Sequence, residues 1–142
     1  MQKFFSLLFI FSILSLTISA CSSHNANDLQ MMSMDQMPSD VQSVPVTVQT
    51  AYQFAAANPD VMKHIPCYCG CGDMGHTSNY DCYVSNVDDK GKVVFDNHAI
   101  GCSICVDITQ DAMRLLKEGK TVPEIKTYVD ATYSKYGISN MP

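Results

Sequence analysis

The apolar positions of this chain recur with a helical period in three separate stretches. The first helix is expected over residues 48–57. Asn58 and Pro59 follow it and predict a cap and a new helical turn. The second helix is expected to begin at Ser103 and to be stopped by Gly119. The residues expected on the buried stripes of these two helices are Val48, Tyr52, Ala55, Ala56, Ile104, Ile108, Ala112, Leu115 and Leu116.

The third helix is expected to open on a capping box formed by Thr121 and Glu124, with Pro123 close to its start. Gly137 is expected to end it. Its buried stripe should consist of Ile125, Tyr128, Val129, Thr132, Tyr133 and Tyr136.

Residues 83–87 and 93–95 are rich in β-branched and aromatic side chains, and the turn-forming residues 88–92 separate them. This pattern predicts a β-hairpin. We therefore expect a mainly α fold with a small β-hairpin, in a compact Cys-rich domain over residues 46–142. A domain of this size buries only a modest core, so a cross-link or a metal ion would help to stabilise it.

The first twenty residues have the pattern of an export signal. Lys3 gives a weakly positive start, residues 4–16 are almost entirely apolar, and the run is short for a membrane-spanning helix. Residues 18–21 read I-S-A-C, which resembles the lipoprotein box of bacteria. This resemblance implies cleavage after residue 20 and a diacylglycerol on Cys21. The alternative is an ordinary signal peptide in which Cys21 has no role.

Two acyl chains anchor a protein stably, whereas one chain does not. The lipoprotein interpretation therefore predicts a membrane-anchored protein on the extracytoplasmic face of the cell membrane.

Residues 21–45 keep no apolar period and are rich in Ser, Asn, Asp and Gln, which predicts a flexible tether. Thioether sulfur is a soft ligand suited to Cu(I), so a group of methionines in this segment suggests an auxiliary copper site. The alternative is a weak hydrophobic contact. The methionines concerned are Met31, Met32, Met34 and Met37.

Charge and motif content narrow the function classes. The chain has 9 Lys and Arg against 14 Asp and Glu, a formal net charge of −5, so it lacks the basic patch that nucleic acids or anionic lipids require. It contains no Gly-rich phosphate loop, no Ser-centred elbow and no convincingly spaced carboxylate pair. We therefore expect neither a classical enzyme nor an organic cofactor.

Seven cysteines are the most unusual part of the composition, and six remain when Cys21 is set aside. Three of them alternate along residues 66–72, where their side chains converge only if Gly70 and Gly72 allow a tight turn. A disulfide between positions two apart is strained, so these three do not pair easily with one another. The six are Cys67, Cys69, Cys71, Cys82, Cys102 and Cys105.

Cys102 and Cys105 form a C-x-x-C pair at the start of a helix, where the helix dipole favours thiolate. His98 lies just before them, and His76 lies between the two groups of cysteines. Because a hairpin returns the chain close to where it left, the segments that flank residues 83–95 should be neighbours. The sequence therefore predicts that the two cysteine groups meet.

Three interpretations of these residues stay open. The six thiols, with His76 and His98 as auxiliary ligands, exceed one tetrahedral site, so either one Zn(II) site with a spare pair or a Cu(I) thiolate cluster is possible. The six cysteines could instead form three disulfides in an exported interaction module without chemistry of its own. The third interpretation is a thiol–disulfide exchange protein that uses Cys102 and Cys105.

Residues 66–71 read P-C-Y-C-G-C, and on this hexapeptide the chain resembles the PCYCGC-motif lipoproteins of bacteria, a family without a settled function. The resemblance continues through residues 75–76, 81–83, 98–99 and 102–105. Residues 102–137 are also similar to the helical thiol-reductase subunits of cytochrome c maturation, which are membrane-tethered three-helix domains. That second resemblance implies that Cys102 and Cys105 are a redox pair.

Overall fold

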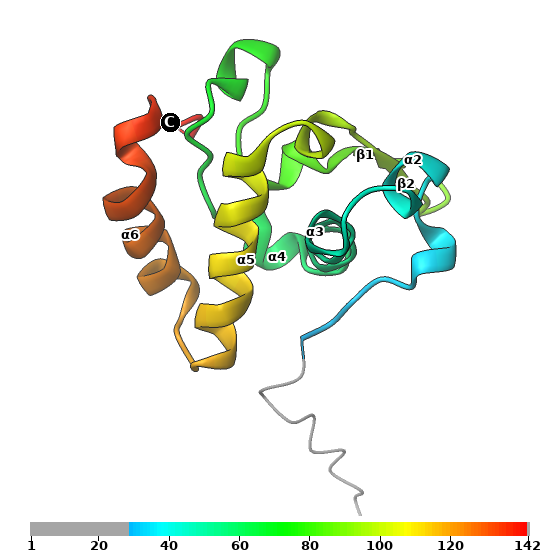
Figure 1. Ribbon diagram of the computed structural model, residues 1–142, viewed down its shortest axis with the longest axis horizontal. Helices are drawn as coiled ribbons and strands as arrows, with labels where there is room; N and C mark the ends of the chain where they lie inside the picture. The colour runs from blue at the N-terminus through cyan, green and yellow to red at the C-terminus, as the bar shows by residue number, and fades with distance from the viewer. Residues whose placement is uncertain (1–28, 142) are drawn as a thin grey trace, which may run out of the picture.

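Helix α5 (Ser103–Lys117) lies between α3 (Val46–Ala57) and α6 (Val122–Tyr133) and packs against both. A computed structural model shows this arrangement and describes residues 29–141 of the chain (Figure 1). In Figure 1, α5 and α6 lie side by side and α3 is seen almost along its axis. The predicted fold class, mainly α with a small hairpin, is confirmed.

The hairpin consists of strands β1 (Val84–Val87) and β2 (Val93–Phe95), which pair antiparallel. Asp88 closes the connecting loop because its carboxylate accepts hydrogen bonds from the backbone N–H groups of Lys90 and Lys92, at 2.9 and 2.8 Å. The strands thus match the predicted stretches to within one residue. The hairpin separates the segment that carries Cys67 to Cys82 from the start of α5.

The chain turns between α3 and the short helix α4 (Pro59–Met62). Asn58 stands at the predicted boundary, but its side chain does not cap α4. Its amide instead donates hydrogen bonds to the backbone oxygens of Phe54 and Gln30, at 2.7 and 2.8 Å. Asn58 therefore ends α3 and ties it to the N-terminal segment.

The boundary between α5 and α6 follows the sequence signals. Gly119 has a φ of +80°, a left-handed conformation that favours glycine. The capping box at the start of α6 is present, with the Thr121 hydroxyl 2.8 Å from the Glu124 carboxylate.

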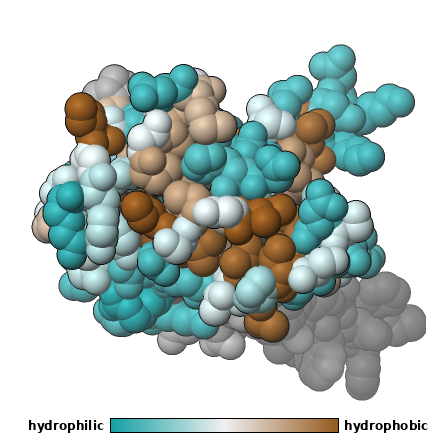
Figure 2. Space-filling view, turned by 45° about the horizontal axis from the view of Figure 1, so that its top comes forward, coloured by the Kyte–Doolittle hydropathy of each residue, from teal (hydrophilic) through white to brown (hydrophobic). Residues whose placement is uncertain are grey.

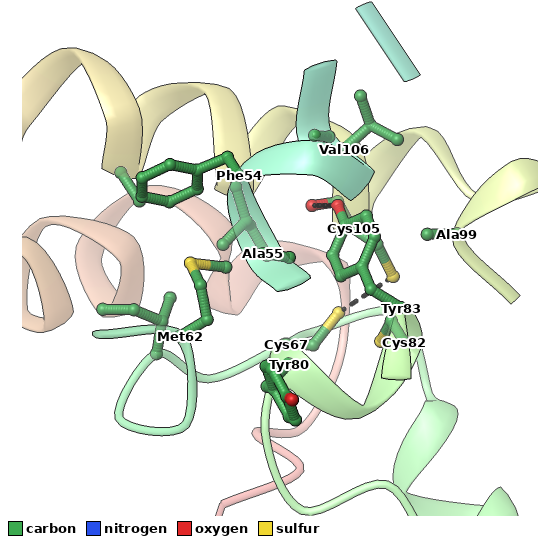
Figure 3. Packing of buried hydrophobic residues seen from close by; sticks show 14 of the residues in the cluster. Phe54, Ala55, Met62, Cys67, Tyr80, Cys82, Tyr83, Ala99, Cys105 and Val106 are labelled. Carbon is green, nitrogen blue, oxygen red and sulfur yellow. Dashed lines mark hydrogen bonds between the residues drawn. The ribbon is translucent and has the colours of Figure 1, made fainter. Parts of the chain in front are cut away.

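The core lies between α3, α5 and the loop that precedes the hairpin (Figure 3). Tyr52 and Tyr83 are fully buried and meet edge to face, with ring centroids 4.9 Å apart. The Tyr83 hydroxyl donates a hydrogen bond to the backbone oxygen of Cys105 at 2.9 Å and lies 2.7 Å from the hydroxyl of Thr109. This buried polar contact fixes the first turn of α5, which carries Cys105, against the hairpin.

The buried stripe of α6 is narrower than predicted. Ile125, Val129 and Tyr133 are buried, one on each successive turn. Tyr128 is exposed by 36%, and Tyr136, which lies beyond the end of α6, is exposed by 55%. The main helix partner of α6 is α5, so the line of side chains that faces α5 is the one that is covered.

The predicted tether is wrong for residues 29–45. This segment folds onto the domain and includes the short helix α2 (Ser39–Gln42). Met37 and Val41 are buried in the core. The backbone N–H of Met32 donates a hydrogen bond to the backbone oxygen of Gln53 at 3.0 Å. The apolar residues that make these contacts are too irregularly spaced to show a period. The predicted export signal and Cys21 lie outside the described residues.

Apolar residues reach the surface near the middle of the face shown in Figure 2, between hydrophilic residues. No helix within residues 29–141 is both long and apolar enough to cross a membrane.

Candidate metal centre

Four short segments bring the six cysteines and both histidines together. They are the loop 66–70 with the turn that follows it, the 3-10 helix η3 (Tyr80–Cys82), the 3-10 helix η4 (His98–Ile100) and the start of α5. Because the hairpin carries the chain from η3 back to η4, the last two segments lie beside the first two. The sequence prediction that the two cysteine groups meet is confirmed, since the sulfur atoms of Cys69 and Cys102 lie within 4.8 Å of each other.

The alternating cysteines converge because the chain bends at Gly70. This residue has a φ of +83°, the left-handed conformation that glycine adopts without steric cost. The sulfur atoms of Cys67, Cys69 and Cys71 consequently lie within 4.8 Å of one another. Gly72 has no left-handed φ, and a β-carbon there would make only an ordinary contact, 3.5 Å from the β-carbon of Asn140.

The sulfur atoms are spaced as in a metal–thiolate centre. The Cys67 sulfur lies 3.3 Å from that of Cys105 and 3.4 Å from that of Cys69, and the Cys71 and Cys82 sulfurs are 3.7 Å apart. Figure 3 shows Cys67 and Cys105 pointing toward each other, with Cys82 nearby. A disulfide needs about 2.05 Å, and all six cysteines of residues 29–141 are free. Tetrahedral coordination with metal–sulfur bonds of about 2.3 Å puts sulfurs about 3.8 Å apart.

Both predicted histidines belong to the cluster. The Nε2 atom of His98 lies 3.5 Å from the Cys69 sulfur, and His76 has a ring nitrogen within 4.8 Å of the sulfurs of Cys71 and Cys82. The two imidazole rings meet edge to face at 5.2 Å. The Nδ1 atom of His76 is buried and has no hydrogen-bond partner. A buried imidazole nitrogen without a protein partner fits a metal ligand, since a satisfied core histidine would be hydrogen-bonded.

Asp96 lies beside both histidines, a position that the sequence analysis missed. Its carboxylate accepts a hydrogen bond from the backbone N–H of His98 at 2.7 Å, and its other oxygen lies 3.8 Å from Nε2 of His76. A carboxylate behind a ligand histidine fixes the orientation of the ring. The position of Asp96, two residues before His98, was a signal that could have suggested this contact.

Asn140 holds the cysteine loop from the C-terminal end of the chain. Its side-chain oxygen accepts a hydrogen bond from the backbone N–H of Cys67 at 2.7 Å. Its side-chain NH₂ group donates hydrogen bonds to the backbone oxygen of Ser78 at 3.0 Å and to the sulfur of Cys71 at 3.5 Å. A β-carbon at Gly137 would stand 2.7 Å from the backbone oxygen of Tyr68. No local sequence signal links these residues, since about seventy positions separate them.

The thiols influence the protonation of one another. Hydrogen bonding from Cys105 and its neighbours holds the pKa of Cys67 well below its usual value. The pKa of Cys105 is raised chiefly by its hydrogen bond to Cys67, and the pKa of Cys82 chiefly by its hydrogen bond to Cys105. Burial raises the pKa of Cys69. One sulfur is therefore favoured as a thiolate while its neighbours hold their protons. A metal cation would favour the thiolate form of all its ligands.

The eight predicted ligands form four overlapping groups of donors that could hold a metal ion, and soft sulfur dominates each of them. The groups are Cys69, His98, Cys102 and Cys105; Cys67, Cys69 and Cys71; Cys67, Cys82 and Cys105; and Cys71, His76 and Cys82.

The predicted methionine ligands have other contacts. Met37 is part of the hydrophobic core, Met32 and Met34 pack against it, and Met31 is exposed by 39%. The core contacts agree with the hydrophobic alternative, and the auxiliary copper role stays a prediction. The redox role of Cys102 and Cys105 likewise stays a prediction. Their sulfurs lie within 4.8 Å of each other, but the shortest sulfur contact of Cys105 is with Cys67.

The chain matches the model of a known protein family. The family described as "Protein of unknown function with PCYCGC motif" matches residues 10–140. No curated protein and no solved structure shows significant similarity to the chain.

Proposed function

The chain belongs to the family of proteins of unknown function with the PCYCGC motif, and we propose that it is a membrane-anchored extracytoplasmic lipoprotein that binds a soft metal ion through its cysteine cluster. One observation carries the metal-binding part of this proposal. Six thiols and two imidazoles from four segments converge on one place, with nearest sulfur distances of 3.3 to 3.7 Å.

The spacing of the donors favours a metal ion over a disulfide framework. The Cys67 sulfur has four sulfur neighbours within 4.8 Å, those of Cys69, Cys71, Cys82 and Cys105. In a framework of separate disulfides, each sulfur has only one close sulfur neighbour, the one to which it is bonded. Such a framework would also give no reason for the buried, unpartnered Nδ1 atom of His76.

The chemistry of the donors selects soft or borderline metals. Thiolates and imidazoles suit Cu(I) and Zn(II), whereas Mg²⁺ and Ca²⁺ prefer oxygen ligands. Cu(I) would form a thiolate cluster and Zn(II) would take four ligands in a tetrahedron. The bound metal would also stabilise a small domain, because its binding free energy adds to the free energy of folding.

The location is proposed from the sequence. Residues 18–21 follow an apolar export signal and place a cysteine where bacterial lipoproteins are acylated. An anchored metal-binding domain at the extracytoplasmic face would meet metal ions from outside the cell. Replacement of Cys21 by Ser is expected to move the protein from the membrane fraction to the soluble fraction. If the variant stays in the membrane fraction, the lipid anchor is wrong.

Titration of the reduced full chain with Zn(II) and with Cu(I), in detergent and without oxygen, tests the metal site. We expect tight, saturable binding of at least one of the two metals, and a loss of affinity in Cys69→Ser but not in the matched control Ser85→Ala, an exposed position on β1. Unchanged stoichiometry and affinity in Cys69→Ser would contradict the thiolate site. Three native disulfides in freshly isolated protein would favour the disulfide framework instead.

Thiol–disulfide exchange is the second candidate, because the half-buried Cys102 is the N-cap residue of α5 and Cys105 lies in the first turn. A C-x-x-C pair that opens a helix is an arrangement found in thiol–disulfide oxidoreductases. This function predicts that Cys102 reacts with a small disulfide faster than a free cysteine does. A slower reaction would exclude it.

A further inference from the structure

We propose that the cluster holds two metal ions in adjoining centres of unequal accessibility, an inference that rests on the proposed function. The outer centre is defined by Cys69, His98, Cys102 and Cys105. The inner centre is defined by Cys67, Cys71, His76 and Cys82. The ion of the inner centre would be structural, and the ion of the outer centre would exchange with an external acceptor.

The outer centre is a complete ligand set by itself. Its four donor atoms all lie within 4.8 Å of one another, and the Cys69 sulfur lies 3.5 Å from Nε2 of His98 and 3.6 Å from the Cys105 sulfur. Three thiolates with one imidazole is a closed tetrahedral set for Zn(II). One ion therefore uses these four residues and leaves four others.

The remaining four residues form the second set. Cys71, His76 and Cys82 have donor atoms within 4.8 Å of one another, and the Cys67 sulfur lies within the same distance of the sulfurs of Cys71 and Cys82. Cys67 also touches Cys105 at 3.3 Å, so it stands where the two centres adjoin. The two sets together contain all eight donors, and each set has three thiols and one imidazole.

His76 supports the inner centre independently of the sulfur distances. Its side chain is nine-tenths buried, its Nδ1 atom has no partner, and Asp96 lies 3.8 Å from its other ring nitrogen. This is the arrangement of a ligand histidine, whose second nitrogen faces a carboxylate. The neighbouring sulfurs of Cys71 and Cys82 make the inner centre the place where Nδ1 would bind.

Burial distinguishes the two centres. Cys67, Cys71 and Cys82 are exposed by at most 1%. In the outer centre, by contrast, Cys69, His98 and Cys102 are only half-buried, and a surface hollow between α3 and the start of α5 reaches Cys102. An incoming thiolate or chelator can therefore replace ligands of the outer ion one at a time, whereas the inner ion has no ligand near the surface.

The test uses the full chain loaded with Zn(II) and mixed with an excess of a chromophoric chelator, with the total zinc measured separately. We expect two ions per chain and release in two phases of equal amplitude. Cys102→Ser should lose one of the two ions and the fast phase, while the matched control Ser103→Ala, an exposed neighbour, should keep both. After the fast phase of the wild-type chain, an alkylating agent should label Cys69 and Cys102 while Cys71 and Cys82 stay protected. This labelling does not depend on the folding of any variant.

Other results separate this inference from the proposed function. One ion per chain, release in a single phase, or equal labelling of all six cysteines after the first phase would overturn the two centres and leave the metal site standing. Failure of the reduced chain to bind either Zn(II) or Cu(I) would overturn both.

Discussion

The sulfur atoms of Cys67 and Cys105 lie 3.3 Å apart although the residues are separated by 38 positions in the chain. The hairpin makes this contact possible, because it returns the chain to the loop that carries Cys67 just before α5 begins. Cys105 is fixed in turn by the Tyr83 hydroxyl, which donates a hydrogen bond to its backbone oxygen at 2.9 Å. The contact therefore joins the PCYCGC loop, the hairpin and α5 in one place.

Replacement of Cys67 by Ser should impair metal binding more than replacement of any residue outside the ligand set. Its sulfur stands within 4.8 Å of four other sulfurs, so its loss affects the whole cluster. Loss of a residue that supports a metal ligand from behind lowers metal affinity by about 10- to 100-fold. We expect the affinity for Zn(II) to fall further than that in Cys67→Ser, because a ligand itself is removed. Competition with a chelator of known affinity measures this. Wild-type affinity in Cys67→Ser would contradict a metal at the centre of the cluster.

Replacement of Asp96 by Asn should weaken metal binding without removing a ligand. Asp96 orients His98 through its backbone N–H and faces the ring of His76. Loss of such a carboxylate costs about 10- to 100-fold in metal affinity. The matched control is Asp89→Asn, an exposed aspartate of the hairpin loop, which should retain wild-type affinity. Equal affinities in the two variants would show that Asp96 does not position the histidines.

Replacement of Asn140 by Ala should destabilise the loop that carries Cys67. The change removes three side-chain hydrogen bonds, each of which contributes about 0.5 to 1.5 kcal/mol, so we expect the free energy of unfolding to fall by about 2 kcal/mol. Denaturant unfolding measures it. The control Ile138→Ala, at a side chain exposed by 89%, should have little effect. Equal stability of the two variants would mean that the C-terminal segment does not hold the loop.

Glu124 should make a pH-dependent contribution to stability. Hydrogen bonds from the backbone N–H and hydroxyl of Thr121 hold the pKa of Glu124 below its usual value. A carboxylate with a lower pKa in the folded state stabilises the fold above its unfolded pKa of about 4.3, and this contribution is lost as the pH falls through the folded value. Glu124→Gln should therefore lower the melting temperature at pH 7.

The difference from wild type should disappear as Glu124 becomes protonated. Glu118→Gln, which removes only an exposed ion pair with Arg114, should have a smaller effect at pH 7. A difference between Glu124→Gln and wild type that is the same at pH 7 and at pH 3 would show that the charge is not the cause.

The sequence was sufficient for α3, α5 and α6, the hairpin and the meeting of the cysteine groups because these depend on local signals. Gly119, the capping box at Thr121 and the turn at Asp88 each act within a few residues of where they stand. A hairpin brings its flanks together whatever side chains they carry.

Contacts between distant segments could not be predicted in this way. Met37 reaches the core from a stretch without apolar period, and Asn140 meets Cys67 across 73 positions. All eight candidate ligands could be predicted from the sequence, because they are cysteines and histidines. Their division between an outer and an inner centre depends on burial, which only the folded chain defines.

X-ray absorption at the metal edge of the full chain, isolated without oxygen, tests the metal-binding claim most directly. We expect a bound metal whose nearest shell is dominated by sulfur at about 2.3 Å, with a minor nitrogen contribution at about 2.0 to 2.1 Å from the histidines. A shell of oxygen and nitrogen without sulfur, or a protein free of metal with the six cysteines of the cluster joined in three disulfides, would contradict a thiolate metal centre.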